Sequence, residues 1–102
     1  MEHARFHIRI LAPANTYIES LSKSERGDIL AGIGTLRGER APSVRTKQLR
    51  GPVRELIVGN HRVTYFRLET TLYFVRGFRK KTNKTPRQEI EYAASIFRQL
   101  ST

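Results

Sequence analysis

The spacing of apolar residues changes along this chain from a helical period to a strand-like one. Residues 13–21 and 24–36 repeat apolar side chains mainly three or four positions apart, as a helix with one buried side does. Pro13 suits a first helical turn, and a second helix is expected to begin near Ser24. Residues 5–11 alternate in part and predict a short strand. The pattern therefore predicts a strand followed by a helical hairpin.

The middle of the chain favours an antiparallel sheet. Residues 53–58 and 61–68 are strand-like and flank Gly59-Asn60, a pair typical of a tight hairpin turn. Residues 71–78 follow a short polar turn and predict a third strand. These strands are apolar on nearly both faces, which indicates a sheet covered by helices on one side and partly shielded on the other.

A polar loop and a final helix complete the predicted order of elements. Residues 37–52 are rich in Gly and Pro and predict a loop with one short strand around 46–49. Residues 85–88 have the form of a capping box, with proline at the first helical position, and an apolar stripe then runs to Leu100. Residues 1–102 therefore predict a single α+β domain. In it, an N-terminal strand and helical hairpin pack on a small antiparallel sheet, together with a C-terminal helix.

Composition narrows the kinds of site that the chain is expected to carry. The 102 residues are 38% hydrophobic, which suits one folded domain with a modest core. The sequence has no cysteine, so disulfides and thiolate metal sites are excluded, and the three histidines lack ligand spacing. We therefore expect no metal site and no cofactor. No apolar run reaches the length of a membrane span and no signal-peptide pattern is present, which predicts a cytoplasmic protein without a membrane partner.

Positive charge is concentrated in the second part of the chain. Nineteen Lys and Arg against nine Asp and Glu give a net charge of +10. Residues 1–36 contain four cations and four anions, whereas residues 37–102 contain fifteen cations and five anions. The densest segment is 77–86, between the third strand of the sheet and the last helix. Such segregation favours a polyanionic partner, above all a nucleic acid, because phosphate contacts need clustered Lys and Arg.

Three motifs in the second half resemble a toxin superfamily. They are "L-x-G-x-x-x-E-L" from Leu49, "H-R-V-x-Y" from His61, and "G-F-x-K-K-x-x-K-T-P-x-x-E-I-E-x-A" from Gly77 to Ala93. The long last motif is the most specific of the three, and the helical hairpin matches by order of elements. On these residues the chain resembles the RelE/ParE toxin superfamily, specifically its HigB-like, phage-derived host-killing branch.

The resemblance implies a RelE-like fold and a type II toxin that acts as a metal-independent endoribonuclease. Such a toxin cuts messenger RNA, usually in the decoding site of a translating ribosome, and so inhibits translation. It also implies a cognate antitoxin, here a HigA-like helix-turn-helix protein, that holds the toxin in a hetero-oligomer. The family often has arginine directly after the Glu-Leu pair, where this chain has Ile57. Arg54, on the opposite face of the strand, is the candidate to compensate.

Cleavage of RNA without a metal places chemical requirements on the side chains. If the 2′-hydroxyl attacks the adjacent phosphate, a base must take its proton, cations must stabilise the phosphorane, and an acid must protonate the 5′ oxygen. Clustered lysines are suited to all three tasks, because neighbouring cations lower the pKa of a lysine in general.

Five residues are the catalytic candidates: Arg62, Lys80, Lys81, Glu55 and His61. Arg62 matches a family arginine and has a planar fork for phosphate, and is expected on a surface or cleft wall. Lys80 and Lys81 alternate on an extended chain, so one of them is expected to face the cleft. Glu55 is either a general base or the ion-pair partner of a nearby cation. His61 suits acid–base chemistry, but its place after a tight turn also predicts an exposed histidine.

A second group is predicted to contact RNA or the ribosome. Arg45 and Lys47 share one face if their segment is extended, and they are candidates for the opposite wall of the cleft. Phe78 is suited to stacking on a base. The complete group is Arg45, Lys47, Arg50, Arg54, Phe78, Arg79, Lys84 and Arg87.

Two other functions fit the same sequence. ParE-like members of the superfamily poison DNA gyrase and share the fold and basic charge, but they typically lack the long motif from Gly77. A basic module that binds RNA or the ribosome without cutting it is the second alternative, and steep salt dependence without cleavage is its signature.

Overall fold

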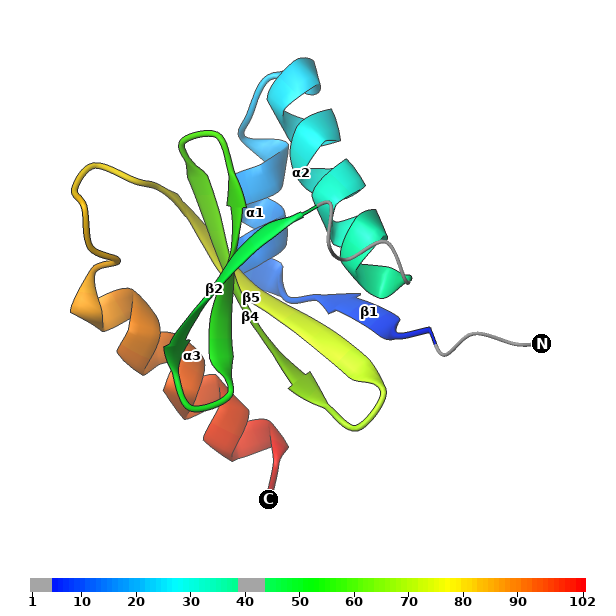
Figure 1. Ribbon diagram of the computed structural model, residues 1–102, viewed down its shortest axis with the longest axis vertical. Helices are drawn as coiled ribbons and strands as arrows, with labels where there is room; N and C mark the ends of the chain where they lie inside the picture. The colour runs from blue at the N-terminus through cyan, green and yellow to red at the C-terminus, as the bar shows by residue number, and fades with distance from the viewer. Residues whose placement is uncertain (1–4, 39–43) are drawn as a thin grey trace.

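The core of the molecule is a twisted five-stranded sheet with helices on both faces (Figure 1). The structure is a computed structural model and describes residues 5–38 and 44–102. Residues 39–43 of the predicted 37–52 loop lie outside the described residues. The elements are β1 (His7–Ile10), α1 (Ala12–Glu19), α2 (Lys23–Arg37), β2 (Arg45–Arg50), β3 (Val53–Val58), β4 (His61–Leu68), β5 (Thr71–Arg79) and α3 (Arg87–Leu100).

The strand order is β1-β5-β4-β3-β2. Strands β2 to β5 form an antiparallel meander, as the hairpin pattern predicts. Gly59 in the β3–β4 turn has a φ of +58°, a conformation that glycine adopts without strain. Strand β1 joins the other edge in parallel to β5, pairing only from His7–Thr71 to Ile10–Phe74. The α+β fold class is thus confirmed, with a parallel edge strand added to the antiparallel meander.

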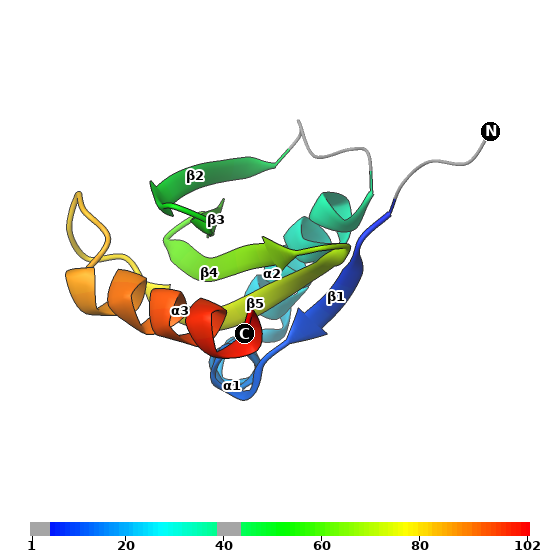
Figure 2. The ribbon, with the colours of Figure 1, turned by 90° about the horizontal axis from the view of Figure 1, so that it is seen from below.

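Two apolar layers hold the helices to the sheet. Helices α1 and α2 cover one face, where Ile18 and Ile29 pack against Leu56 and Val63. Helix α3 covers part of the other face, where Ala93 packs with Phe66 and its neighbours. Figure 2 shows α3 along one side of the sheet and the helical hairpin on the other. Both faces of β4 are therefore buried, and its apolar residues point to both sides, Val63 and Tyr65 to one layer and Phe66 to the other.

The helix starts agree with the sequence pattern only in part. Pro13 lies in the first turn of α1, as predicted. Helix α2 begins at Lys23, and its cap is Ser22: the Glu25 amide donates to Ser22 Oγ at 3.2 Å and the Ser22 amide donates to Glu25 Oε1 at 3.4 Å. This reciprocal capping box stabilises the start of the helix one residue before the predicted position.

The capping box predicted for the last helix is wrong. Pro86 occupies the N-cap position of α3, and no side-chain cap bond forms there. The Thr85 hydroxyl instead donates to Glu55 Oε1 on β3 at 2.8 Å. A buried carboxylate, which needs donors in the absence of water, is the stronger acceptor for this hydroxyl. Within the described ranges, no helix has the length and apolar character needed to cross a membrane.

Candidate functional site

Strand alternation places the two adjacent candidates of β4 on opposite faces of the sheet. His61 lies on the side covered by α1 and α2, whereas Arg62 lies on the side of α3. Glu55 pairs with Thr64, so it shares the α3 side with Arg62. The "H-R" dipeptide therefore serves two different polar clusters.

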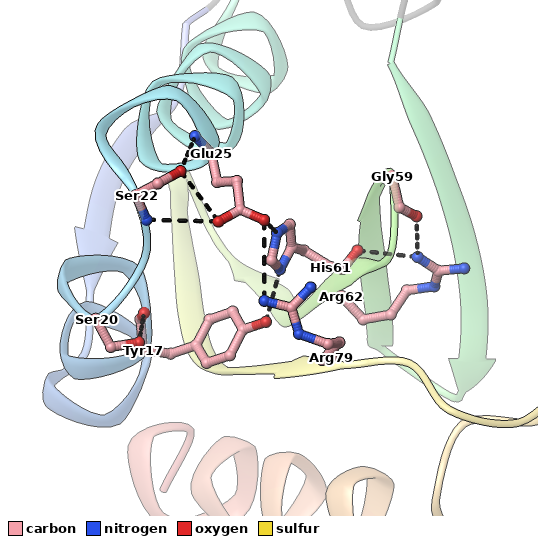
Figure 3. Close-up of polar contacts among 8 residues, drawn as sticks. All are labelled: Tyr17, Ser20, Ser22, Glu25, Gly59, His61, Arg62 and Arg79. Carbon is pink, nitrogen blue, oxygen red and sulfur yellow. Dashed lines mark hydrogen bonds and ion pairs between the residues drawn. The ribbon is translucent and has the colours of Figure 1, made fainter.

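His61 is buried, with 5% of its surface exposed, so the expectation of an exposed turn histidine is wrong. The Tyr17 hydroxyl lies 2.6 Å from His61 Nδ1, and Glu25 Oε2 lies 3.1 Å from His61 Nε2 (Figure 3). Side-chain hydrogen bonds from His61, and then Ser22, hold the pKa of the Glu25 carboxyl below its usual value. With Glu25 ionised, His61 donates from Nε2 and accepts the Tyr17 proton at Nδ1. Partners from both helices make burial of this histidine possible.

Tyr17 is held in place by a glycine on the facing strand. A Cβ at Gly77 would collide with the Tyr17 ring, so the ring occupies the space that a larger residue would fill. Burial raises the pKa of the Tyr17 phenol, the nearby Arg79 lowers it by a smaller amount, and Glu25 raises it further. Arg79 Nη2 in turn lies 3.8 Å from Glu25 Oε2. These contacts define the Tyr17–His61–Glu25 cluster, which reaches from the helical hairpin to the end of β5.

Arg62 is also buried, with 7% exposed, which contradicts its expected position on a surface or cleft wall. Its Nη1 donates to the carbonyls of Gly59 at 2.8 Å and His61 at 2.9 Å, and its Nε lies 3.9 Å from Glu55 Oε2. The charge is buried because the turn carbonyls and the carboxylate satisfy the guanidinium. In this arrangement Arg62 closes the β3–β4 turn.

Glu55 is almost fully buried, with 3% exposed. It receives the Thr85 hydrogen bond and faces Arg62, so the predicted ion pair is present. Because Thr85 belongs to the segment between β5 and α3, Glu55 ties that segment to the sheet. The Glu55–Arg62–Thr85 cluster therefore anchors the loop that carries the lysines.

A groove of about 590 Å³ follows the free edge of β5. It opens where the β1–β5 ladder ends at Phe74 and the chain continues into α1. We call it the β5-edge groove, and its lining residues are Tyr17, Gly77, Phe78, Arg79, Lys81, Pro86 and Glu89. Lys81 lines it and Lys80 does not, in line with the predicted alternation. The backbone amide of Lys80 donates to the Asn60 carbonyl in the β3–β4 turn at 2.8 Å.

A second, smaller groove of about 270 Å³ lies between β2 and α3. We call it the β2–α3 groove; Lys47 and Lys84 are its two cations, and Gln48, Leu49, Thr85 and Ile90 complete its lining. Exposed Arg45 pairs with Ile57, on the same face of β2 as Lys47, whereas Arg50 is exposed at the end of this strand. Thr85 links this groove to the Glu55 cluster.

Three further candidates for RNA contact, Arg54, Arg87 and Phe78, lie in different parts of the molecule. Arg54 lies on the face of α1 and α2 and donates to Thr46 Oγ1 at 3.0 Å. Ile57 pairs with Arg62 on the other face, so Arg54 does not replace a cation there. Arg87 is exposed on α3 and pairs with Glu91 at 3.1 Å. Phe78 pairs with Arg62 across the strands and lines the β5-edge groove.

Sequence reasoning missed four polar residues of this region. Tyr17 and Glu25 belong to helices whose pattern indicated packing alone. Arg76 donates to Glu89 Oε1 at 2.8 Å and lies 4.0 Å from the centroid of the Tyr92 ring. The capping-box form around Ser22 was the one local signal that set Glu25 apart.

Comparison with solved structures identifies the fold. The fold matches the archaeal RelE–RelB complex from Pyrococcus horikoshii OT3 with a TM-score of 0.62 at 17% identity, over 74% of this chain and 96% of that chain. It matches the toxin–antitoxin complex RelBE2 from Mycobacterium tuberculosis with a TM-score of 0.61 at 16% identity, over 74% of this chain and 99% of that chain. It matches the RelB–RelE complex from Methanococcus jannaschii with a TM-score of 0.60 at 15% identity, over 82% of this chain and 95% of that chain. At these identities the matches show the fold.

The sequence itself matches a family model over most of its length. Residues 16–98 match the family described as phage derived protein Gp49-like. The chain therefore belongs to the phage-derived Gp49-like family, and its fold is RelE-like, as the resemblance predicted. Comparison with curated proteins finds no match.

Proposed function

We propose that this chain is the toxin of a type II toxin–antitoxin system, of the HigB-like branch, and that it cuts messenger RNA on the ribosome in the cytoplasm. The observation that carries the proposal is the β5-edge groove, where Arg79 and Lys81 lie beside the Tyr17–His61–Glu25 cluster with its buried histidine. Two cations, an aromatic ring and a hydroxyl in one groove match what a scissile RNA phosphate and its neighbouring base require.

The groove supplies charge stabilisation through side chains. Arg79 and Lys81 are exposed residues of the same groove, so they are available to the phosphate and to the charge that develops on the phosphorane. Lys81 also carries protons that it can give to the 5′ oxygen as the chain breaks. Lys47 and Lys84, in the β2–α3 groove, are suited to the flanking backbone phosphates.

Dependence on the ribosome follows from how open this site is. Almost half of the Arg79 side chain, 48%, is exposed, and the β5-edge groove runs along the outside of the sheet. An open groove holds a flexible single strand in many poses, and cleavage needs one pose with the 2′-hydroxyl in line. The ribosome supplies that orientation by holding the message at its decoding site.

The same cations are expected to attract the antitoxin. The similar structures contain RelE-type toxins in complex with RelB antitoxins. For this chain we propose a hetero-oligomer with a HigA-like helix-turn-helix protein that covers the cations or moves α3 away from the sheet. A chain that stays monomeric and toxic when co-expressed with its genomic neighbour would contradict this partner.

Induced expression tests the function against its two alternatives. Expression should stop growth, create new transcript 5′ ends and leave DNA supercoiling unchanged. The variant Arg79→Gln/Lys81→Gln should lose this effect, whereas Lys23→Gln/Arg98→Gln is a control that removes the same charge from exposed residues elsewhere. Loss of supercoiling with intact messages would support gyrase poisoning instead. Arrest with intact messages and normal supercoiling would support a non-cleaving module that binds RNA or the ribosome.

A further inference from the structure

The Tyr17–His61–Glu25 cluster contains the order of groups used to activate a hydroxyl. The Tyr17 hydroxyl faces His61 Nδ1 at 2.6 Å, and the opposite ring nitrogen faces Glu25 Oε2 at 3.1 Å. A hydroxyl, an imidazole and a carboxylate in this sequence form a chain along which a proton can pass to the imidazole. The carboxylate fixes the tautomer and stabilises the resulting imidazolium.

The Tyr17 hydroxyl also belongs to the groove in which the RNA phosphate is proposed to bind. Tyr17 lines the β5-edge groove together with Arg79 and Lys81, while His61 behind it is 5% exposed. Figure 3 shows the Tyr17 hydroxyl joined to the His61 ring, with the Arg79 guanidinium drawn beside this contact. A group at the groove wall, with a buried histidine behind it and a carboxylate on the far side of that histidine, has the layout of an acid–base residue supported by positioning residues.

We propose that Tyr17 is the general base of the RNA cleavage and that His61 and Glu25 are positioning residues that activate it. The inference rests on the proposed function and assigns its proton-transfer step. It assigns the role of general base, for which Glu55 was a candidate, to a residue of α1, since Glu55 is buried with Arg62 on the other face of the sheet.

The step balances with groups that line the groove. The 2′-hydroxyl oxygen attacks the adjacent phosphorus as its proton passes to the Tyr17 oxygen and the Tyr17 proton passes to His61 Nδ1. The bond between phosphorus and O5′ breaks, its electron pair stays on O5′, and the Lys81 ammonium gives O5′ a proton. The products are a 2′,3′-cyclic phosphate and a 5′-hydroxyl. His61 then returns its extra proton to solvent and Lys81 takes one up.

The environment of the Tyr17 phenol favours a concerted step, in which Tyr17 gains one proton as it gives the other to His61. Burial raises the pKa of Tyr17, so the resting phenol keeps its proton and gains basicity only as that proton moves to His61. The titratable and charged groups around His61 are Tyr17 on α1, Glu25 on α2 and Arg79 at the end of β5; its β3 neighbour is Val58. The only carboxylate among these groups is Glu25, and it contacts the nitrogen that an imidazolium uses to donate.

The variant Tyr17→Phe tests the proposal because it keeps the ring against Gly77 and removes the hydroxyl. Single-turnover cleavage of message on programmed ribosomes should be slower by about a hundredfold or more. The residual rate should rise about tenfold per pH unit from about pH 6 to about pH 8.5, since hydroxide then replaces the base, while the wild-type rate flattens over this range. Glu25→Gln should lower the rate less, because an amide oxygen still accepts from His61. Tyr73→Phe, outside the β5-edge groove, should cut at the wild-type rate.

Two controls separate chemistry from folding and binding. Thermal melts should show Tyr17→Phe folded at the assay temperature, and its binding to ribosomes carrying a 2′-O-methyl message should equal that of the wild type. A Tyr17→Phe protein that cuts at the wild-type rate overturns the proposal. So does one that cuts slowly with the wild-type pH dependence, because Tyr17 would then have only a structural role. A wild-type protein that cuts no message on ribosomes overturns the proposed function, and the general-base assignment falls with it.

Discussion

Two buried charged side chains, Glu55 and Arg62, hold the end of the sheet beside the grooves. Arg62 binds two turn carbonyls and faces Glu55, which also receives the Thr85 hydroxyl. Each group supplies the hydrogen bond or opposite charge that its neighbour would otherwise take from water. Removing one member therefore leaves another buried and unpaired, and the effect appears first in stability.

Arg62→Ala is expected to lower the free energy of unfolding by about 3 kcal/mol, because it leaves the buried Glu55 without its opposite charge and removes a side-chain donor from two carbonyls. Arg62→Lys should recover part of this loss, since an ammonium reaches fewer of the three acceptors. Urea unfolding of each variant measures the change, with Arg98→Ala on the exposed end of α3 as the control, expected within about 0.5 kcal/mol of wild type. Unfolding of Arg62→Ala at the wild-type urea concentration would contradict a structural role for this arginine.

Glu25 makes the stability of the fold depend on pH in the acidic range. Its pKa is lowered in the folded protein from the ordinary 4.5, chiefly by the His61 hydrogen bond. The carboxylate therefore contributes stability above that pH, and the contribution is lost as the pH falls below it. The melting temperature of Glu25→Gln should fall less between about pH 6 and about pH 3 than that of the wild type. Equal falls in the two proteins would show that Glu25 has no such linkage.

At the scale of elements, the sequence pattern predicted the helices and strands whose conformation depends on residues close together in the chain. The β3–β4 hairpin, β5 and the helical hairpin follow from apolar spacing and turn residues over short stretches. The site follows from contacts between distant parts of the chain: Tyr17 and His61 are 44 residues apart, and Glu55 and Thr85 are 30 apart. A single sequence contains no signal for such pairs, so His61 was expected to be exposed and Thr85 to cap a helix.

The loop between β5 and α3 depends on its hydrogen bond to β3. Thr85→Val keeps the shape of the side chain and removes the donor, so the buried Glu55 loses a partner at a cost of about 1.5 kcal/mol. Cleavage on ribosomes should fall as well, because Lys81 and Lys84 are on the same loop and would lose their fixed positions. Thr35→Val, a matched change on α2, should alter neither property by much. A Thr85→Val protein with wild-type activity would show that the loop is positioned in another way.

At the scale of the whole molecule, the fold gathers charge that the sequence spreads over many segments. Lys47 from β2, Arg79 from the end of β5 and the lysines of the following loop come together around one end of the sheet. Sequence composition predicted a polyanionic partner, and the segregation of charge predicted that residues 37–102 would contact it. Which cations share a groove was decided by strand register and by the early end of the β1–β5 ladder.

The most direct test of the proposed function is the cleavage pattern that purified protein produces on one message, free and bound to programmed ribosomes. We predict breaks in the coding region of the ribosome-bound message, with 5′-hydroxyl and 2′,3′-cyclic phosphate ends, at least about a hundredfold faster than in the free message. The Arg79→Gln/Lys81→Gln protein should produce no such breaks, while the Lys23→Gln/Arg98→Gln control should match the wild type. A message that stays intact on ribosomes, or one that is cut equally fast when free, would contradict a ribosome-dependent endoribonuclease.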